Sequence, residues 1–220
     1  MEYKRITLLC GHYGSGKTNI ALNMAYEIKQ TYDNVAIADL DIVNPYFRTK
    51  DSEEELKEKG IRLIASEYAG TNVDIPALPQ DMYSLTDDKT VKAVIDVGGD
   101  DRGALALGRI SPKIMEENDY EAFLVINKYR PLTPDVASTL EVMAEIETAG
   151  SFKFTGIINN SNLGVQTTAE DVLNSLKYAE DVSNATGLPL VCTSVNETLF
   201  DELCGKIDNL FPLKLQKKIN

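Results

Sequence analysis

The stretch Gly11-His12-Tyr13-Gly14-Ser15-Gly16-Lys17-Thr18 decides the fold of this chain. It fits the pattern G-x-x-x-x-G-K-[S/T] of a P-loop, which wraps a phosphate chain with backbone N–H groups. The apolar residues 6–10 before it predict a buried strand, and apolar residues recur at helical spacing after it, between Ile20 and Ile28. Because strand, loop and helix follow in the order that phosphate binding requires, we expect all eight residues to bind a nucleotide. The alternative is a glycine turn that binds nothing.

Two side chains of the P-loop carry further expectations. Lys17 is expected to reach the β- and γ-phosphates as a catalytic residue, because its charge would stabilise the phosphoryl group during transfer. The hydroxyl of Thr18 is expected to ligate Mg²⁺. The helix that follows should point its positive N-terminal end at the phosphates.

The composition of the chain limits its class and its partners. A length of 220 residues suits one α/β domain, so residues 1–220 are expected to form a single nucleotide-binding domain. The absence of a run of about 18 apolar residues argues against a membrane span, and a strand expected from residue 6 leaves no room for a signal peptide. Three cysteines far apart in sequence suit a reducing cytoplasm. An excess of 34 acidic over 22 basic residues disfavours non-specific binding to DNA or anionic lipid.

Carboxylates follow two further apolar strands. Residues 34–39 predict one strand, which ends at Asp39 and is followed by Asp41, and residues 91–96 predict another that ends at Asp96. The carboxyl ends of parallel strands are where α/β sheets bind ligands, so Asp39 and Asp96 are expected to hold Mg²⁺ together with Thr18. Gly99 is expected to bring a backbone N–H to the γ-phosphate, which makes residues 98–101 a candidate switch. A pair of solvated loop acids at 39 and 41 is the alternative.

The remaining pattern alternates between strands and helices. It predicts a doubly wound α/β fold, with a mostly parallel sheet and helices on both faces. Residues Thr167 to Glu170 are typical of a capping box at the start of a helix that ends at Gly187. The irregular stretch 65–88 is long for a connection and is expected to cover the nucleotide or a partner surface, with a short helix near 80–85. A disordered insertion is the alternative. Further strands are expected at 61–64, 122–128, 154–160 and 188–195, and further helices at 51–60, 134–149 and 199–207.

The order of these motifs resembles the MinD/ParA ATPases of the CobQ/CobB/MinD/ParA group. The resemblance implies Mg-dependent binding of ATP and ADP, slow ATP hydrolysis and a nucleotide switch that acts on a protein or small-molecule partner. It also implies that Asp41 positions the attacking water as a catalytic residue. The family's P-loop carries a lysine where this chain has His12. In the family that lysine reaches the nucleotide of the facing subunit. Because this chain lacks the lysine, a nucleotide-dependent dimer is an open expectation here.

The expected base is adenine. Binding of guanine through the pattern Asn-Lys-x-Asp needs a carboxylate at its last position, and this chain has Asn127-Lys128-Tyr129-Arg130. An arginine cannot accept hydrogen bonds. Asn159 and Asn160, at the end of a predicted strand, resemble the family's adenine-reading asparagine; a role as turn residues is the alternative.

Three other functions are compatible with these motifs. A small-molecule kinase, an ATP-dependent ligase and a nucleotide-gated adaptor that does not hydrolyse ATP would share the same P-loop.

The C-terminal stretch 210–220 holds apolar and basic residues, but Pro212 leaves barely two helical turns after it. We therefore expect Leu210, Phe211 and Leu213 to pack onto the domain, and we expect no stable binding to membranes or DNA.

Overall fold

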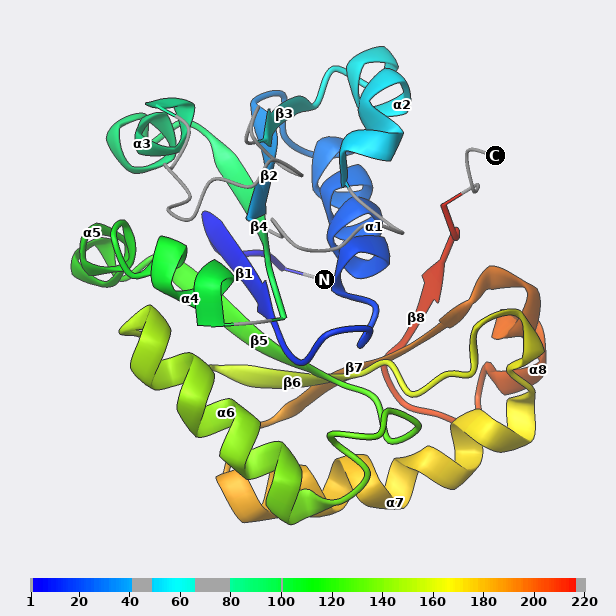
Figure 1. The fold of residues 1–220 in the computed structure, drawn as a ribbon. Coiled ribbons are helices and arrows are strands. Elements are labelled where there is room, and N and C mark those ends of the chain that lie inside the picture. Colours follow the sequence, from blue (N-terminus) through cyan, green and yellow to red (C-terminus); the bar gives the residue numbers. More distant parts are fainter. Residues whose placement is uncertain (1, 41–48, 66–79, 100, 217–220) are drawn as a thin grey trace.

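The computed structural model describes residues 2–40, 49–65, 80–99 and 101–216, in which strands and helices alternate (Figure 1). The strands are β1 (Ile6–Cys10), β2 (Val35–Leu40), β3 (Arg62–Ala65), β4 (Lys92–Val97), β5 (Tyr120–Ile126), β6 (Gly156–Asn159), β7 (Leu190–Asn196) and β8 (Leu210–Leu213). The α-helices are α1 (Lys17–Lys29), α2 (Glu53–Glu58), α3 (Gln80–Asp87), α4 (Asp101–Leu107), α5 (Ser111–Glu117), α6 (Val136–Gly150), α7 (Ala169–Thr186) and α8 (Phe200–Leu203). Short 3₁₀ helices are η1 (Thr49–Ser52), η2 (Gly164–Gln166) and η3 (Glu197–Leu199).

All eight of these strands form one sheet in the order β3-β2-β4-β1-β5-β6-β7-β8. Each neighbouring pair is parallel. On one side of β1 lie β4, β2 and β3, in that spatial order, and on the other side β5 to β8 follow in chain order. Ligands of open α/β sheets bind at the carboxyl ends of strands where the order reverses, and in this sheet that point lies beside β1.

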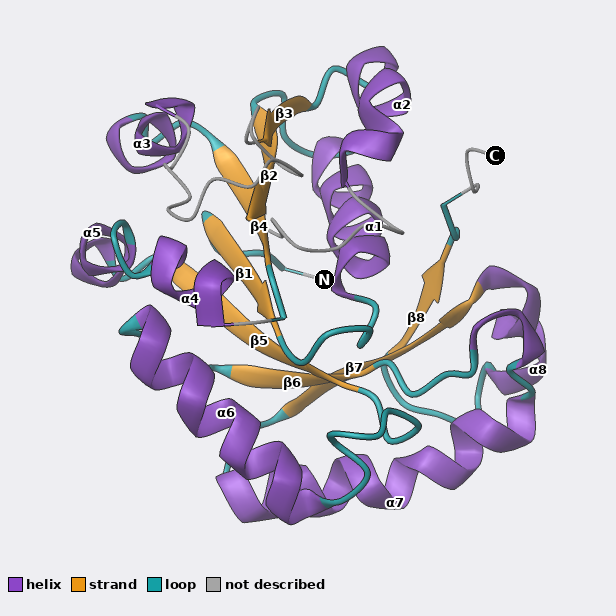
Figure 2. Cartoon of the chain, viewed as in Figure 1, coloured by secondary structure: helices purple, strands orange, loops and turns teal. Residues whose placement is uncertain are grey.

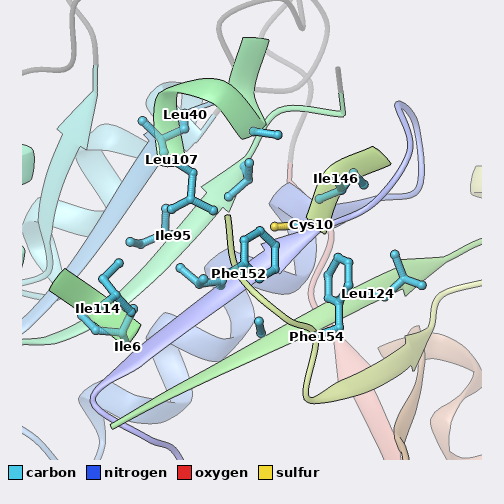
Figure 3. Close-up of a cluster of buried hydrophobic side chains, with 14 of the residues drawn as sticks. Ile6, Cys10, Leu40, Ile95, Leu107, Ile114, Leu124, Ile146, Phe152 and Phe154 are labelled. Carbon is cyan, nitrogen blue, oxygen red and sulfur yellow. The ribbon is translucent and has the colours of Figure 1, made fainter. Parts of the chain in front are cut away.

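Helices cover both faces of the sheet. Helices α1 and α2 lie on one face, and α3 to α7 lie on the other (Figure 1). Alternate residues of β1 enter the two buried clusters: Leu9 packs with α1, whereas Leu8 and Cys10 pack on the opposite side. Figure 3 shows part of that second cluster, where Leu107 of α4 and Ile146 of α6 approach the sheet together with Phe152. The expected doubly wound fold is confirmed, with a sheet that is parallel throughout the described residues.

Helices α4 and α5 are not among the elements that the sequence pattern predicts. Gly103 and Gly108 lie within and after α4, and glycine lowers helix propensity by about 1 kcal/mol relative to alanine. Most helical stability in proteins comes from packing of an apolar face. Four apolar residues in or between these helices are buried in the cluster beneath them, namely Ala104, Leu107, Ile110 and Ile114.

The capping box of α7 lies one residue later than expected. Thr168, not Thr167, is the N-cap, and it accepts a hydrogen bond from the backbone N–H of Asp171, whose side chain accepts one from the backbone N–H of Thr168. Thr167 instead donates its hydroxyl to the carbonyl of Gly164. Both threonines have an acidic residue three positions later, so the sequence alone does not choose between them.

The C-terminal segment packs onto the domain, as expected, but it does so as the edge strand β8. Phe211 and Leu213 are buried, and the exposed Pro212 occupies an edge position, where the missing backbone N–H is tolerated. The chain then runs along α1, because Asn23 exchanges hydrogen bonds with the backbone of Lys214. Among the helices of the described residues, none has the length and apolar content needed to cross a membrane.

Candidate functional site: a P-loop between carboxylates and amides

The predicted P-loop connects β1 to α1. It leaves the sheet after Cys10 and enters the helix at Lys17 (Figure 2). Gly16, just before the helix, has a φ of 90°, and a Cβ there would lie 2.2 Å from Nδ2 of Asn160. Only glycine therefore fits this position, because of its backbone conformation and because of the close approach of that amide.

The side chain of Lys17 lies back over the loop. Its Nζ donates to the carbonyl oxygen of His12 at 3.3 Å, and the same oxygen accepts from the backbone N–H of Ser15 at 3.1 Å. The hydroxyl of Ser15 is buried and has no hydrogen-bond partner within the described part of the chain. A buried hydroxyl without a partner calls for an explanation, and a phosphate oxygen held by the loop would supply one. The loop therefore fits a bound phosphate chain.

The predicted metal residues meet on the α1 face of the sheet. Oγ1 of Thr18 donates to Oδ2 of Asp96 at 2.7 Å. Asp39 and Asp96 are register partners on the adjacent strands β2 and β4, so their side chains leave the same face of the sheet. Asp96 is fully buried. The structure thus brings together three residues that lie far apart in sequence.

The oxygen atoms of this group suit Mg²⁺, which prefers hydroxyl, carboxylate, phosphate and water ligands. No group of three or more histidine, cysteine, aspartate or glutamate residues with metal-site geometry occurs in the described ranges. Mg²⁺ is usually bound by one or two carboxylates together with substrate phosphates, so an incomplete protein cage fits this ion. Asp41, the predicted water-positioning residue, lies outside the described residues.

A further hydroxyl that the sequence did not point to faces the same carboxylate. Oγ1 of Thr49, in η1, lies 3.5 Å from Oδ2 of Asp96, and Thr49 is fully buried. No sequence motif around Thr49 predicts a role at this site. Its position depends on how the chain returns to the sheet between β2 and β3.

Gly99 lies against the P-loop, as the proposed switch requires. A Cβ on this residue would be 2.4 Å from the backbone nitrogen of Tyr13 and 2.8 Å from the carbonyl carbon of His12. The loop after β4 therefore touches the backbone of the phosphate-binding loop directly. Asp100 lies outside the described residues, as does the part of the expected covering stretch between 66 and 79; the expected helix near 80–85 is confirmed as α3.

The amides of Asn159 and Asn160 are engaged within the protein. Consecutive residues at a strand end point to opposite faces. Asn159 faces α7, where its Nδ2 donates to Ser175 at 3.0 Å, and its Oδ1 accepts from the backbone N–H and the hydroxyl of Ser161. On the other face, Asn160 donates to the carbonyl of Ser15 at 2.6 Å and accepts from the hydroxyl of Ser194 at 2.8 Å.

These bonds bear on the expected reading of adenine. Asn160 lies at the P-loop but braces its backbone, and Asn159 lies away from the loop. Both residues are buried, so an amide that read a base would first have to give up its present partners. The adenine-reading role remains a prediction for both residues.

The loop after β5 also reaches the P-loop. Oδ1 of Asn127 accepts from the backbone N–H groups of Tyr129 and Asn162, which ties this loop to the loop after β6. Arg130 extends from the same loop to Gly14: a Cβ on Gly14 would lie 3.5 Å from its Nε. In the sequence, Arg130 indicated only that guanine is not the bound base. Its contact with the P-loop had no sequence signal of its own.

Cys10 adjoins the site without taking part in its chemistry. It ends β1 immediately before the loop and is fully buried. Burial raises the pKa of its thiol well above the ordinary range, and nearby Lys17 lowers it by less. The thiol is therefore protonated at neutral pH and is not a nucleophile. Cys192 is also buried, and burial raises the pKa of its thiol to about 12.

Comparison with known proteins supports the fold. No protein-family model and no curated protein matches the sequence. Among solved structures, the cell division protein FtsY of Thermotoga maritima is 19% identical with a TM-score of 0.58, over 87% of this chain and 62% of that chain. FtsY of Mycoplasma mycoides is 20% identical with a TM-score of 0.53, over 87% of this chain and 60% of that one.

A third similar structure is the signal recognition particle 54 kDa protein from Aeropyrum pernix K1 in complex with GDP. It is 18% identical with a TM-score of 0.52, over 86% of this chain and 41% of that chain. This chain thus spans less than two thirds of the length of each of the three proteins. At these identities the likeness concerns the fold: the chain has an α/β fold of the P-loop NTPase type.

Proposed function

We propose that this chain binds a nucleoside triphosphate with Mg²⁺ at residues 11–18 and acts as a nucleotide-dependent switch. The observation that carries the proposal is the 2.7 Å hydrogen bond between the hydroxyl of Thr18 and the carboxylate of Asp96. It places a hydroxyl and a buried carboxylate side by side at the start of α1, next to Lys17. A P-loop that binds Mg-nucleotide uses such a pair: the hydroxyl ligates the metal, and the strand-end acid helps to hold it.

Each residue then has a defined role. Lys17 leaves the carbonyl of His12 and pairs with the β- and γ-phosphates, while the hydroxyl of Ser15 and the loop's N–H groups donate to phosphate oxygens. Thr18 ligates Mg²⁺, and Asp39 and Asp96 orient its water ligands. When bound, Mg²⁺ neutralises charge that develops between the phosphates.

The switch is assigned to the loop that contains Gly99. Its contact with the backbone of Tyr13 gives it a position from which to sense whether a γ-phosphate is present. From the resemblance to the MinD/ParA ATPases we assign water positioning to Asp41, slow hydrolysis to the site, and a nucleotide-dependent dimer as the assembly to test. The partner is a protein or small molecule.

Adenine is the proposed base, although two proteins of similar fold were solved with GDP. Guanine bound through the loop after β5 would need a carboxylate at position 130. Arg130 has only donors and carries a fixed positive charge. ATP is therefore expected to displace bound nucleotide more effectively than GTP.

Equilibrium binding tests the proposal. We expect the purified protein to bind ATP in the presence of Mg²⁺, and to bind it less tightly when the metal is chelated. Lys17→Ala should weaken binding by about 10- to 100-fold, the range for a lost charged hydrogen bond. Lys29→Ala is the matched control, because it removes the same charge from the far end of the same helix, where Lys29 contacts the carbonyl of Asp33. A folded protein that binds neither ATP nor GTP would overturn the proposal.

Turnover assays separate the switch from the other classes. A slow ATPase releases phosphate without a second substrate, whereas a kinase or ligase turns over ATP only when its metabolite is added. A nucleotide-gated adaptor binds ATP and hardly hydrolyses it. Light scattering with ADP and with a non-hydrolysable ATP analogue tests the dimer.

A further inference from the structure

The side chain of Arg130 lies against the P-loop, and its Nε has no hydrogen-bond partner among the described residues. The position that a Cβ would occupy on Gly14 is 3.5 Å from Nε of Arg130 and 3.7 Å from its Cδ and Cζ. Nε is buried and forms no hydrogen bond in the part of the chain that the structure describes. The same part of the chain contains no carboxylate in ion-pair contact with this guanidinium.

Such an arrangement is costly unless a ligand completes it. An arginine remains charged at any ordinary pH, and a buried donor without an acceptor carries a desolvation penalty. The chain has 34 acidic residues that could have supplied a partner. Next to Gly14, however, the expected acceptors are the oxygens of a phosphate chain in the loop. The planar fork of a guanidinium suits phosphate oxygens particularly well.

The loop that carries Arg130 is fixed at both sides of this residue. The backbone N–H of Arg130 donates to the carbonyl of Asn127 at 3.1 Å, and its carbonyl accepts from the N–H of Thr133 at 3.1 Å. The amide of Asn127 in turn binds the backbone of Asn162. The backbone that carries this side chain is therefore fixed beside the P-loop before any nucleotide arrives, which reduces the entropy lost on binding.

We propose that Arg130 is a nucleotide-binding residue whose guanidinium donates hydrogen bonds to the phosphate chain. It supplies, from the same chain, a second cation beside Lys17. This inference rests on the proposed function and names a phosphate contact for the same site. This role of Arg130 does not depend on the base, because the phosphate chain is common to all nucleotides.

Calorimetric titration with Mg-ATP, Mg-GTP and Mg-tripolyphosphate tests the contact. Tripolyphosphate has no base or ribose, so it isolates the phosphate contribution. Arg130→Gln should weaken binding of all three by a similar factor, about 10- to 100-fold, and Arg130→Lys should recover part of the loss because it keeps the charge without the fork. Lys128→Gln is the matched control: it removes the same charge from the same loop, but the Nζ of Lys128 donates to the carbonyl of Asn174 on α7. We expect it to change binding by less than about twofold.

Several results would overturn the inference. A loss for ATP with unchanged tripolyphosphate binding would assign Arg130 to the base or ribose. Unchanged binding of all three by folded Arg130→Gln would make the residue structural. If that variant fails to fold by circular dichroism, Arg130→Lys decides, because unchanged tripolyphosphate binding in that variant rules out the bidentate contact. Wild-type protein that binds none of the three ligands would defeat the proposed function itself, and this inference with it.

Discussion

The sheet edge on one side of β1 differs in chemistry from the edge on the other. On one side, β4 and β2 carry the carboxylates of Asp96 and Asp39 near their carboxyl ends. On the other side, the chain places amides at the ends of β5 and β6, with Asn127 and Asn160 next to the P-loop and its supporting turns. Both sides approach the same loop, but among the described residues one side offers the acids Asp39 and Asp96 and the other offers asparagines.

This difference follows from the hydrogen bonds that amides and carboxylates can form within the protein. An amide carries donors and acceptors, so the amide side completes its hydrogen bonds with backbone and serine groups. An ionised carboxylate accepts only, and burying one is expensive unless it is paired or close to a cation. The carboxylate side is therefore suited to binding a cation, and the amide side to holding the loop in shape. We expect substitutions on the first side to change binding and those on the second to change stability.

The largest effect is expected from Asp96→Asn. The change keeps the shape of the side chain but removes the charge, so affinity for Mg-ATP should fall by about 100-fold or more. The melting temperature without nucleotide should move by no more than about 4 °C, the equivalent of about 1 kcal/mol in a chain of this length. Asp33→Asn, the same change at an exposed acid, is the control for calorimetry and thermal denaturation. Unaltered Mg-ATP binding would show that the carboxylate side is not the metal side.

On the amide side, Asn160→Ala should act mainly on stability. It removes a donor to the carbonyl of Ser15 and an acceptor for Ser194, and leaves both groups buried. We expect a loss of about 2 kcal/mol in the free energy of unfolding and a fall of about 4–8 °C in melting temperature. Asn34→Ala, which removes one exposed hydrogen bond to Thr90, should cost far less. An unchanged melting temperature combined with lost ATP binding would instead make Asn160 a ligand residue, in line with the adenine-reading role.

A smaller effect is expected from Thr49→Val, which removes a hydroxyl from the surroundings of Asp96 while keeping the volume. The 3.5 Å separation indicates a weak hydrogen bond. The Mg²⁺ concentration that gives half-maximal ATP binding should therefore shift by about 2- to 10-fold. Thr139→Val, in which a buried hydroxyl of α6 is lost on the opposite face of the sheet from α1, should leave this value unchanged. If the two variants behave alike, Thr49 has no part in the carboxylate group.

The smallest effect is expected from a charge contact outside both groups. Lys214 pairs with Glu55 at 2.9 Å on the surface, and its hydrogen bond is the main cause that lowers the pKa of Glu55. Because this pKa is depressed in the folded state, the pair stabilises the protein above the ordinary glutamate pKa, about 4.3, and the contribution is lost as the pH falls through the folded value. Lys214→Ala should cost no more than about 1 kcal/mol at neutral pH and nothing in acid. Thermal denaturation at both pH values measures this, and a larger loss, or one that persists in acid, would contradict it.

The sequence predicted the parts of this site that depend on local pattern. The strand, loop and helix around residues 11–18 are contiguous, so their order could be predicted directly. The meeting of Asp39 with Asp96 could be predicted as well, because both residues end apolar strands and parallel strands share one carboxyl edge. Given the fold, the carboxylate side of the site could therefore be predicted from the sequence.

The amide side could be located from the sequence but not interpreted. The use of Asn160 depends on Ser194, which β7 brings to it, and on a carbonyl of the P-loop. The contact of Arg130 with Gly14 likewise depends on a loop conformation that no local pattern specifies. Helix α4 was missed because packing outweighs the effect of Gly103, and the short α5 was missed because it too depends on packing. Strand β8 was missed because a proline in a lysine-rich tail does not predict a strand.

A crystal structure with a non-hydrolysable ATP analogue and Mg²⁺ tests the central claim most directly. We predict that residues 11–18 wrap the phosphates, that the metal contacts the hydroxyl of Thr18 on the side of Asp39 and Asp96, and that Asn160 still holds the carbonyl of Ser15. A nucleotide bound elsewhere, or a metal coordinated away from these carboxylates, would contradict the account.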